Sequence, residues 1–476
     1  MTSPELPEVP RAAKRLTPAQ RAAVGKVARK AVPRTSHAQW DPPSSRPDPV
    51  ELLRSQETSR VEELVPLRHQ RMLVSPFTFY RGAAIVMASD LSMTPTTGLR
   101  VQLCGDAHLA NFGGFAAPDR KLVFDINDLD ETSPGSFEWD VKRLAASFEI
   151  AARDNGFTAK KAREIVLTVV GAYRVAMNDF ATMRNLDVWY ARADAQTVID
   201  RWGADAGPDE QKRLQAMVAK AESKDSTKAL SKLTVRDGDT YRIKSDPPVV
   251  VPVSELAAEQ GLALSEDELV EWLRTKFSIY RRSLQADRRH LLDGYELVDF
   301  ARKVVGVGSV GTRCWIGLFL GRDDQDPLFL QIKEAEPSVL AQYAGKSGYA
   351  NHGQRVVEGQ RLLQAASDTL LGWLHATGLD GTDRDFYVRQ LWDWKVSADL
   401  ESMTPAIMKI YAQLCGWTLA RGHARSGDRI AIAAYLGTSD TFDGAVADFA
   451  AAYADQNERD HTAAARVFTN ASAPTA

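Results

Sequence analysis

The feature that most constrains the fold is the glycine-rich segment ARKVVGVGSVGTRCWIGLFLG, residues 301–321. Gly306, Gly308 and Gly311 have the spacing of a dinucleotide-binding fingerprint, but that fold requires a helix to begin after the third glycine. Here β-branched and aromatic residues follow, which is typical of a strand. We therefore expect an antiparallel hairpin, in which the backbone N–H groups of the glycines and Ser309 can cover nucleotide phosphates.

The next β-type run, LFLQIKEA (328–335), places Lys333 among apolar residues. A buried ammonium needs a charged partner, so Lys333 suits the α- and β-phosphates of a nucleotide. Glu358, in the following helical segment, is the predicted carboxylate partner of this lysine, and Glu334 and Glu336 are weaker alternatives. A hairpin edge whose lysine extends to solvent is the alternative interpretation.

A second polar group lies far upstream, in LCGDAHLANFGGF (103–115) and KLVFDINDLDET (121–132). Both segments contain short β-type runs, and the turn AAPDR between them predicts a hairpin. Phosphoryl transfer needs a base near the attacking hydroxyl and oxygen ligands for a divalent ion. An Asp and an Asn on one loop, followed by carboxylates one strand later, have this composition.

In this interpretation Asp106 is the catalytic base, and Asn111 and Asp128 bind Mg²⁺ or Mn²⁺. Asp125 and Asp130 are further ligands of the ion or support its ligands.

His108 has two possible positions. It either packs beneath the loop or joins Asp106 in contacting substrate or metal. The structural alternative for the whole group is an ordinary Gly-Asp turn followed by a solvated acidic rim.

Helical patterns surround these segments and predict an α+β fold. Residues 1–45 are rich in Pro, Arg, Ala and Ser, which indicates a flexible N-terminal arm. Residues 46–298 should form a mainly helical region that carries the catalytic loop and metal-binding strand, with a charged helical insertion at 185–285. Residues 299–400 should form a β-rich nucleotide-binding region, and 401–476 a set of C-terminal helices. Within these regions, helices are expected at 50–72, 77–91, 139–185, 207–235, 265–284, 353–374, 404–428 and 443–460, and a hairpin at 235–251. The run 139–185 should form two helices, the first ending on Gly156 and the second starting from Thr158.

The composition excludes several classes of protein. A formal net charge of -3 argues against nucleic-acid binding driven by overall charge. No apolar run approaches the roughly 18–20 residues of a membrane span, and the N-terminus lacks the apolar core of a secretion signal. Cys104, Cys314 and Cys415 lie far apart, as expected of free thiols. We expect a cytoplasmic protein with no nucleic-acid or membrane partner.

Several segments also resemble a bacterial family called domain of unknown function 2252, over roughly residues 35–465. The resemblance is carried by SPFTFYRG, CGDAHLANFG, FDINDLDET, EWDVKRLAAS, KVVGVGSVGTR, LFLQIKEA and RVVEGQRLLQAASD. More distantly, GDAHLAN is similar to the catalytic loop of aminoglycoside and choline phosphotransferases, which have a protein-kinase-like fold. NDLDE resembles their metal-binding segment, with Asp128 and Asp130 as the ligands and Leu129 in place of an aromatic residue.

This second resemblance implies a role for Asp140, which is similar to the aspartate that braces the catalytic loop from a following helix. It also implies a circularly permuted kinase-like fold of two lobes, because the catalytic segment here precedes the glycine-rich hairpin. The segment LARGHARSGD (419–428) resembles the end of the helix that normally leads into the catalytic loop. His423 and Asp428 would then either approach the site or serve in packing and helix capping.

The sequence thus favours an ATP- and Mg²⁺-dependent phosphotransferase that transfers a phosphoryl group to a hydroxyl of a small molecule. Arg81 and Arg143 are candidates to bind the acceptor or phosphate, or to form structural ion pairs. Transfer of AMP on the same fold is the first alternative, and a nucleotide-binding pseudokinase scaffold is the second. A metallophosphatase is least favoured, because it would leave the glycine-rich hairpin unexplained.

Overall fold

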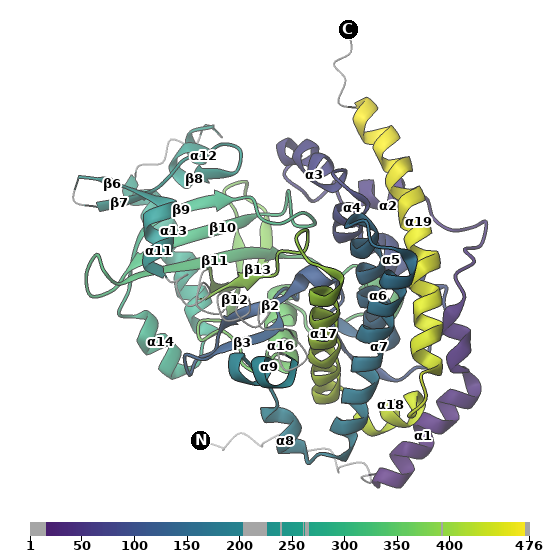
Figure 1. The fold of residues 1–476 in the computed structure, drawn as a ribbon. Coiled ribbons are helices and arrows are strands. Elements are labelled where there is room, and N and C mark those ends of the chain that lie inside the picture. The colour runs from purple at the N-terminus through teal and green to yellow at the C-terminus, as the bar shows by residue number, and fades with distance from the viewer. Residues whose placement is uncertain are drawn as a thin grey trace, which may run out of the picture.

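The computed structural model describes residues 16–202, 226–238, 240–259, 261, 266–391 and 394–471. Figure 1 shows a β-rich part beside a larger helical part. Helices and antiparallel sheets together form the α+β fold that the sequence predicts. No helix in the described ranges is long and apolar enough to cross a membrane.

The β-rich part is a six-stranded antiparallel sheet in the order β12-β13-β11-β10-β9-β8. Its strands are β8 (Val250–Pro252), β9 (Glu296–Lys303), β10 (Cys314–Leu320), β11 (Pro327–Ala335), β12 (Gly372–Thr377) and β13 (Asp383–Gln390). The glycine-rich segment joins β9 to β10, which confirms the predicted hairpin. In the register of the sheet, Lys333 lies between Cys314 and Tyr387.

Apolar clusters cover both faces of this sheet. On one face Ala229 and Leu230 of α11 (Ser226–Leu233) pack with Ile316 and Leu318. On the other, Leu273 and its neighbours on α13 (Glu266–Arg282) pack with strand residues. The remaining elements around the sheet are α12 (Val253–Glu259), α14 (Ala286–Leu292), and the hairpin of β6 (Thr234–Asp237) and β7 (Thr240–Ile243). The hairpin predicted at 235–251 is found as β6 and β7, over residues 234–237 and 240–243. Of the helix predicted at 207–235, residues 207–225 lie outside the described residues.

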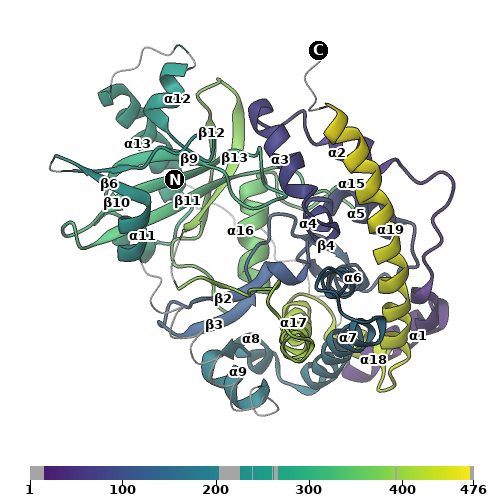
Figure 2. The same cartoon turned by 45° about the horizontal axis from the view of Figure 1, so that its top comes forward.

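Helix α16 (His352–Leu363) connects β11 to β12 and lies between the sheet and α17 (Pro405–Ser426) (Figure 2). Asn351 caps its N-terminus by accepting a hydrogen bond from the N–H of Gln354. Val356 and Val357 pack against Tyr387 and its neighbours on the sheet. The helix therefore joins the β-rich part to the helical part.

Two small sheets carry the upstream polar segments. β1 (Arg100–Leu103) pairs with β4 (Ser133–Ser136), and β2 (Phe112–Ala116) pairs with β3 (Leu122–Ile126). The hairpin predicted across the turn AAPDR is confirmed as β2 and β3. The second sheet also contains β5 (Ala193–Asp194) and β14 (Val396–Ser397), in the order β14-β2-β3-β5.

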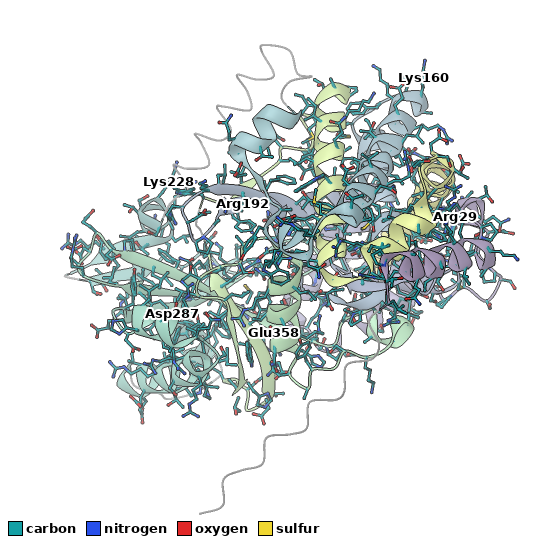
Figure 3. All side chains as sticks on the ribbon, turned by 90° about the horizontal axis from the view of Figure 1, so that it is seen from below. Arg29, Lys160, Arg192, Lys228, Asp287 and Glu358 are labelled. Atoms are coloured by element: carbon teal, nitrogen blue, oxygen red, sulfur yellow. The ribbon has the colours of Figure 1, made fainter. Side chains whose placement is uncertain are left out.

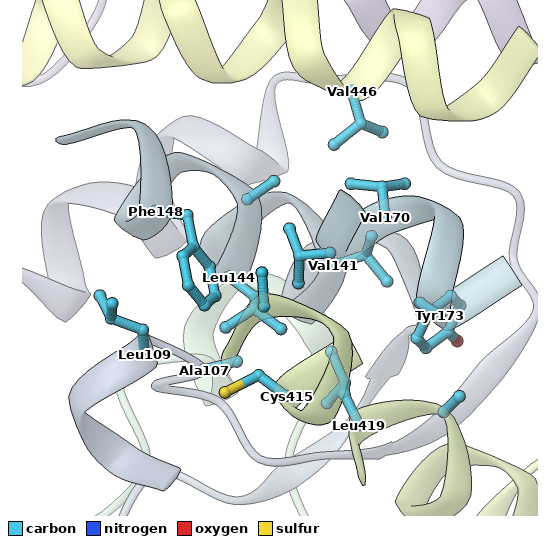
Figure 4. Packing of buried hydrophobic residues seen from close by; sticks show 14 of the residues in the cluster. Ala107, Leu109, Val141, Leu144, Phe148, Val170, Tyr173, Cys415, Leu419 and Val446 are labelled. Atoms are coloured by element: carbon cyan, nitrogen blue, oxygen red, sulfur yellow. The ribbon is translucent and has the colours of Figure 1, made fainter. Parts of the chain in front are cut away.

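The helical part is built around α6 (Glu138–Asp154), α7 (Ala159–Thr182), α17, α18 (Arg429–Leu436) and α19 (Thr441–Ala471). Gly156, with φ +71°, ends the first helical run, and Thr158 caps α7, so the boundary between them follows from two residues. Figure 4 shows side chains of this core, in which Leu144 and Val170 pack with Leu419 and Val446 from much later in the chain.

Three expected boundaries differ in the structure. Residues 16–45, expected to be flexible, contain α1 (Pro18–Ala31), and Arg29 on this helix donates a hydrogen bond of 2.7 Å to the carbonyl of Tyr435. Residues 401–476 do not form a separate unit, because α17 and α19 share one core with α6 and α7. β8, from the region expected to be helical, is an edge strand of the large sheet.

The expected helices at 50–72 and 77–91 are each divided. The first becomes α2 (Pro49–Ser55) and α3 (Val65–Met72), and the second becomes α4 (Pro76–Gly82) and α5 (Ala84–Ser92). Ala83 interrupts the second pair because its backbone leaves the helical region, with φ -110° and ψ 37°. The other described helices are α8 (Asn185–Tyr190), α9 (Ala195–Trp202) and α15 (Ala341–Ala344).

Candidate functional site

The two polar groups of the sequence meet at one cavity of about 140 Å³, which we call the central cavity. Residues of the upstream segments and of the glycine-rich loop both line it, namely Asp106, His108, Asn111, Asp128, Asp130, Glu131, Gly306, Gly308 and Ser309. Lys333 lies against Asp128 and Asp130 at its edge. Tertiary folding therefore brings together residues that are far apart in the chain.

The loop after β1 is held from below by α6. Asp140 accepts hydrogen bonds from the N–H groups of Cys104 and Gly105, at 2.7 and 3.0 Å. Gly105 has φ +86°, and a Cβ there would lie 2.2 Å from the carbonyl oxygen of Glu131, so glycine is required. His423 Nε2 lies 3.1 Å from Asp140, which places this histidine beneath the loop rather than in the cavity.

Arg143 of α6 forms an ion pair with Asp106. Its Nε donates to Asp106 Oδ1 at 2.7 Å, and its guanidinium lies 4.5 Å from the ring centroid of Tyr80. Burial opposes the charge of Arg143, but Asp106 outweighs it and raises the pKa of the guanidinium. This pair orients the Asp106 carboxylate and leaves Oδ2 on the side of His108, 3.6 Å from its Nε2.

His108 is buried within the loop. Its backbone N–H donates to the carbonyl of Asp106 at 2.8 Å, and its ring Nδ1 has no hydrogen-bond partner among the described residues. Burial lowers the pKa of His108 to about 3, against the opposing effect of Asp106. The imidazole is therefore neutral near pH 7.

Asn111 and Asp128 are the residues of the cavity best placed to hold a metal ion, were one to bind. Asn111 Nδ2 donates to the Asp106 carbonyl at 2.8 Å, which fixes the side-chain amide at the cavity wall. Asp128 Oδ1 is buried and has no hydrogen-bond partner among the described residues. An oxygen of this kind fits a divalent cation. No group of three or more His, Cys, Asp or Glu side chains suited to a metal occurs in the described ranges, so the Asn111 amide oxygen would have to complete the ligand set.

Lys333 pairs with Asp128, 3.4 Å from Oδ2, and with Asp130. Burial opposes the ammonium, but both carboxylates outweigh it and raise the pKa of Lys333. Burial also opposes ionisation of Asp128, yet Lys333 and Arg389 hold its pKa below the usual range. Burial and the charge of Asp128 raise the pKa of Asp130, whose carboxyl also accepts a hydrogen bond from Tyr387.

The expected pair of Lys333 with Glu358 is not formed. Glu358 instead pairs with Arg361 on the partly exposed side of α16, with 3.1 Å between Arg361 Nη1 and Glu358 Oε1. Figure 3 labels Glu358 on this helix. The phase of the helix explains the difference, because the face toward the cavity presents Arg355 and Gly359.

Asp125 was predicted to bind the metal or to support its ligands, but the structure places it in the core. It is fully buried, pairs with Arg421 of α17, and accepts a hydrogen bond of 2.9 Å from the N–H of Ala365. Its charge is thus satisfied within the core. Asp428, another residue singled out in the sequence, caps α18 and pairs with Arg21, so it is not part of the cavity.

The glycine-rich loop covers the cavity and rests on residues of α3 and α4. Arg71 Nη1 donates to the Gly306 carbonyl at 2.9 Å, and a Cβ on Gly308 would lie 3.2 Å from the Arg81 carbonyl oxygen. In the described part of the chain, the N–H groups of residues 306–309 donate to no other backbone group. Gly311, with φ +90°, lies behind the cavity, where its carbonyl accepts a hydrogen bond from Val61.

Three charged residues near the cavity, Arg60, Arg389 and Lys395, were not assigned from the sequence. Arg60 lines the cavity together with Arg81, which the sequence did suggest, and both have a buried Nε without a hydrogen-bond partner among the described residues. Beside Asp128, Arg389 donates to Gln331 Oε1 at 2.9 Å. Burial, assisted by Arg389, lowers the pKa of the nearby Lys395 to about 8. In the sequence, Arg389 and Lys395 stand out only as charged residues within the aromatic run FYVRQLWDWK.

Comparison with known proteins gives one relationship. A search of curated proteins and of solved structures found no match. The family model described as "Uncharacterized protein conserved in bacteria (DUF2252)" matches residues 60–466, which include every residue of the central cavity except Gln56. Because the match spans most of the chain, this protein belongs to the DUF2252 family.

Proposed function

We propose that the protein is an ATP- and Mg²⁺-dependent phosphotransferase with a kinase-like arrangement of its site. The observation that carries this proposal is the central cavity itself. A glycine-rich loop, a lysine held by two aspartates, and an Asp-x-His-x-x-Asn loop converge there from distant parts of the sequence.

The order of elements in the large sheet supports the proposal. A glycine-rich hairpin, the Lys333 strand, helix α16 and the last strand β13 follow one another as in the nucleotide-binding lobe of kinases. The end of α17 supports a circular permutation, because Ser426 Oγ accepts a hydrogen bond of 3.2 Å from the N–H of Gln102 at the start of the catalytic segment. A helix that leads into this segment in kinases would end at the same point.

The chemical roles follow from the geometry. Asp106, oriented by Arg143, would accept or align the proton of the attacking hydroxyl through Oδ2. Asn111 and Asp128 would hold Mg²⁺, which neutralises phosphate charge when bound. When a nucleotide binds, Lys333 would turn from its ion pairs with Asp128 and Asp130 toward a phosphate. At about 140 Å³ the cavity is below the roughly 300–1,000 Å³ of pockets that enclose drug-sized ligands, so we expect it to take the phosphates while the nucleoside lies outside.

The direct test is calorimetric binding of ATP with and without Mg²⁺. We expect Mg²⁺ to tighten binding to the wild type, and Lys333→Ala and Asp128→Ala each to weaken it by about tenfold or more. Lys346→Ala, at an exposed position outside the cavity, is the control and should bind as the wild type does. Each variant is first compared with the wild type by thermal unfolding. A folded wild type that binds no ATP under either condition would contradict the proposal.

Labelled ATP separates the reactions that the site permits. Phosphoryl transfer moves a γ-label to the acceptor, whereas AMP transfer moves an α-label. We expect transfer of the γ-label, and loss of transfer with retained ATP binding in Asp106→Asn.

A further inference from the structure

A second and larger cavity, of about 420 Å³, lies on the opposite face of the six-stranded sheet. We call it the outer cavity. Strands β9 to β13 form its floor, α13 forms its roof, and residues 60–63 close one end. Figure 1 shows α13 beside this sheet. Arg60 is the one residue that lines both this cavity and the central cavity among the described residues. The outer cavity is therefore a separate space with its own chemistry.

The body of the outer cavity is apolar and aromatic. Phe300 and Trp315 stack on the floor, with ring centroids 5.5 Å apart and planes inclined by 20°. Trp272, Leu273 and Phe277 of α13 face them from the roof. This surface suits a flat or chain-like apolar group, because it offers aromatic contact on two sides.

The end at residues 60–63 presents Arg60 and Arg302 beside the exposed carboxylates of Glu62 and Glu63. Arg302 is 8% exposed, and its Nη2 donates to Glu63, whose own side chain is largely solvated. Its Nε has no hydrogen-bond partner in the described ranges. Arg60 forms no ion pair with a described residue, and its Nη1 donates to the Val310 carbonyl. Each of the two arginines thus keeps one buried Nε–H without a partner, from which a bound anion can accept a hydrogen bond.

The other two arginines of the cavity are already paired. Arg313 and Arg384 both contact Glu334, and Arg384 also contacts Asp380. Lys276 lines the roof, with its Nζ 5.1 Å from the ring centroid of Trp272. The buried donors of the lining that lack a partner among the described residues belong to Arg60 and Arg302, which gives the cavity an apolar body and one end with free N–H groups.

We propose that the outer cavity binds an amphipathic small molecule with an apolar or aromatic body and one anionic group, such as a carboxylate or sulfonate. The body lies between the Phe300–Trp315 pair and α13, and the anion accepts hydrogen bonds from Arg302 and Arg60. The volume is within the roughly 300–1,000 Å³ of cavities that hold such ligands. This proposal does not depend on the reaction at the central cavity.

Two fluorescent probes that differ in charge test it on the full chain. The anionic probe is 1-anilinonaphthalene-8-sulfonate, and the neutral probe is 1-anilinonaphthalene, which lacks the sulfonate. We expect saturable binding of both at one site, tighter for the anion. Arg302→Gln should weaken the anionic probe at least fivefold and change the neutral probe less than twofold. Arg274→Gln, an exposed arginine of α13 outside the cavity, is the matched control and should change neither.

Filling the cavity tests its location. Ala376→Trp places an indole on the floor and should abolish binding of both probes, and Leu379→Trp is a milder second variant at the rim. Thermal unfolding is measured for each, because these probes also bind partly unfolded proteins. Undiminished binding to either folded tryptophan variant, or equal weakening of both probes by Arg302→Gln, would overturn the proposal.

Discussion

Two buried histidines, His37 and His108, make single-residue contributions to the pH dependence of stability. Burial, with a smaller effect of Lys142, lowers the pKa of His37 to about 3, and burial lowers that of His108 to the same value. His37 remains hydrogen-bonded to the Tyr435 hydroxyl at 2.7 Å. Both side chains are therefore neutral in the native protein where an unfolded chain would protonate them.

We predict that the protein loses stability as the pH falls from about 6.5 toward 3. In this window the unfolded state binds a proton at each histidine and the native state does not, so protonation favours unfolding. The expected loss is about 2 kcal/mol per histidine between pH 7 and pH 5. Thermal unfolding across this range measures it. His37→Gln and His108→Gln should each flatten the pH dependence, whereas His290→Gln, at an exposed position, should leave it unchanged. An unaltered slope in both buried variants would refute the assignment.

At the scale of elements, the position of α16 depends on one glycine. A Cβ on Gly359 would lie 2.4 Å from Thr132 Cγ2 and 2.7 Å from Thr132 Oγ1, so the helix sits directly on the segment after β3. This segment carries Asp128 and Asp130. The close approach of helix and segment therefore helps to define the central cavity.

Gly359→Ala should accordingly lower the free energy of unfolding by about 1–3 kcal/mol, because overpacking outweighs the gain in helix propensity. Under the proposed function it should also weaken Mg²⁺-dependent ATP binding, since α16 would be displaced from the segment that carries Asp128 and Asp130. Gly444→Ala in α19 is the matched control. No atom lies within 4 Å of a Cβ there, so this variant should gain about 0.5–1 kcal/mol. Chemical denaturation of both variants gives the comparison, and a stabilised Gly359→Ala would contradict it.

At the scale of the whole molecule, Arg355 ties the two parts together. Its Nη1 donates to the Thr132 carbonyl at 2.6 Å, and its Nη2 donates to the carbonyls of Asp130 and Glu336, both at 2.8 Å. The helical part and the β-rich part thus share one buried guanidinium, which lies at the junction where the central cavity forms.

We predict that Arg355→Lys destabilises this junction by about 2–4 kcal/mol, because one ammonium cannot reproduce the planar set of bonds to three buried carbonyls. Hydrogen exchange should increase in both residues 128–132 and residues 336–340, on the two sides of the junction. Arg361→Lys, on the same helix but one-third exposed, should have a smaller effect and leave exchange at 128–132 unchanged. Faster exchange on one side alone would show that the residue does not couple the two parts.

Local sequence predicted the elements that carry the site. The strands around the Asp106–Asn111 loop, the hairpin with Gly306 and the boundary at Gly156 and Thr158 all depend on residues close together in the chain. The positions of Asp106 and Asn111 on one loop also follow from their spacing, because the loop is short and begins directly at the end of a strand.

The partners of the charged residues were decided by the tertiary structure. Lys333 was expected beside Glu358, but sheet register and helix phase direct it to Asp128 and Asp130. Asp125 was expected at the metal, but Arg421, from a helix near the end of the chain, pairs with it in the core. The sequence by itself determined which segments form strands, loops and helices, because backbone preference and side-chain periodicity act over a few residues. Only folding decided which charges meet, because an ion pair depends on the packing of whole elements and carries no local signal.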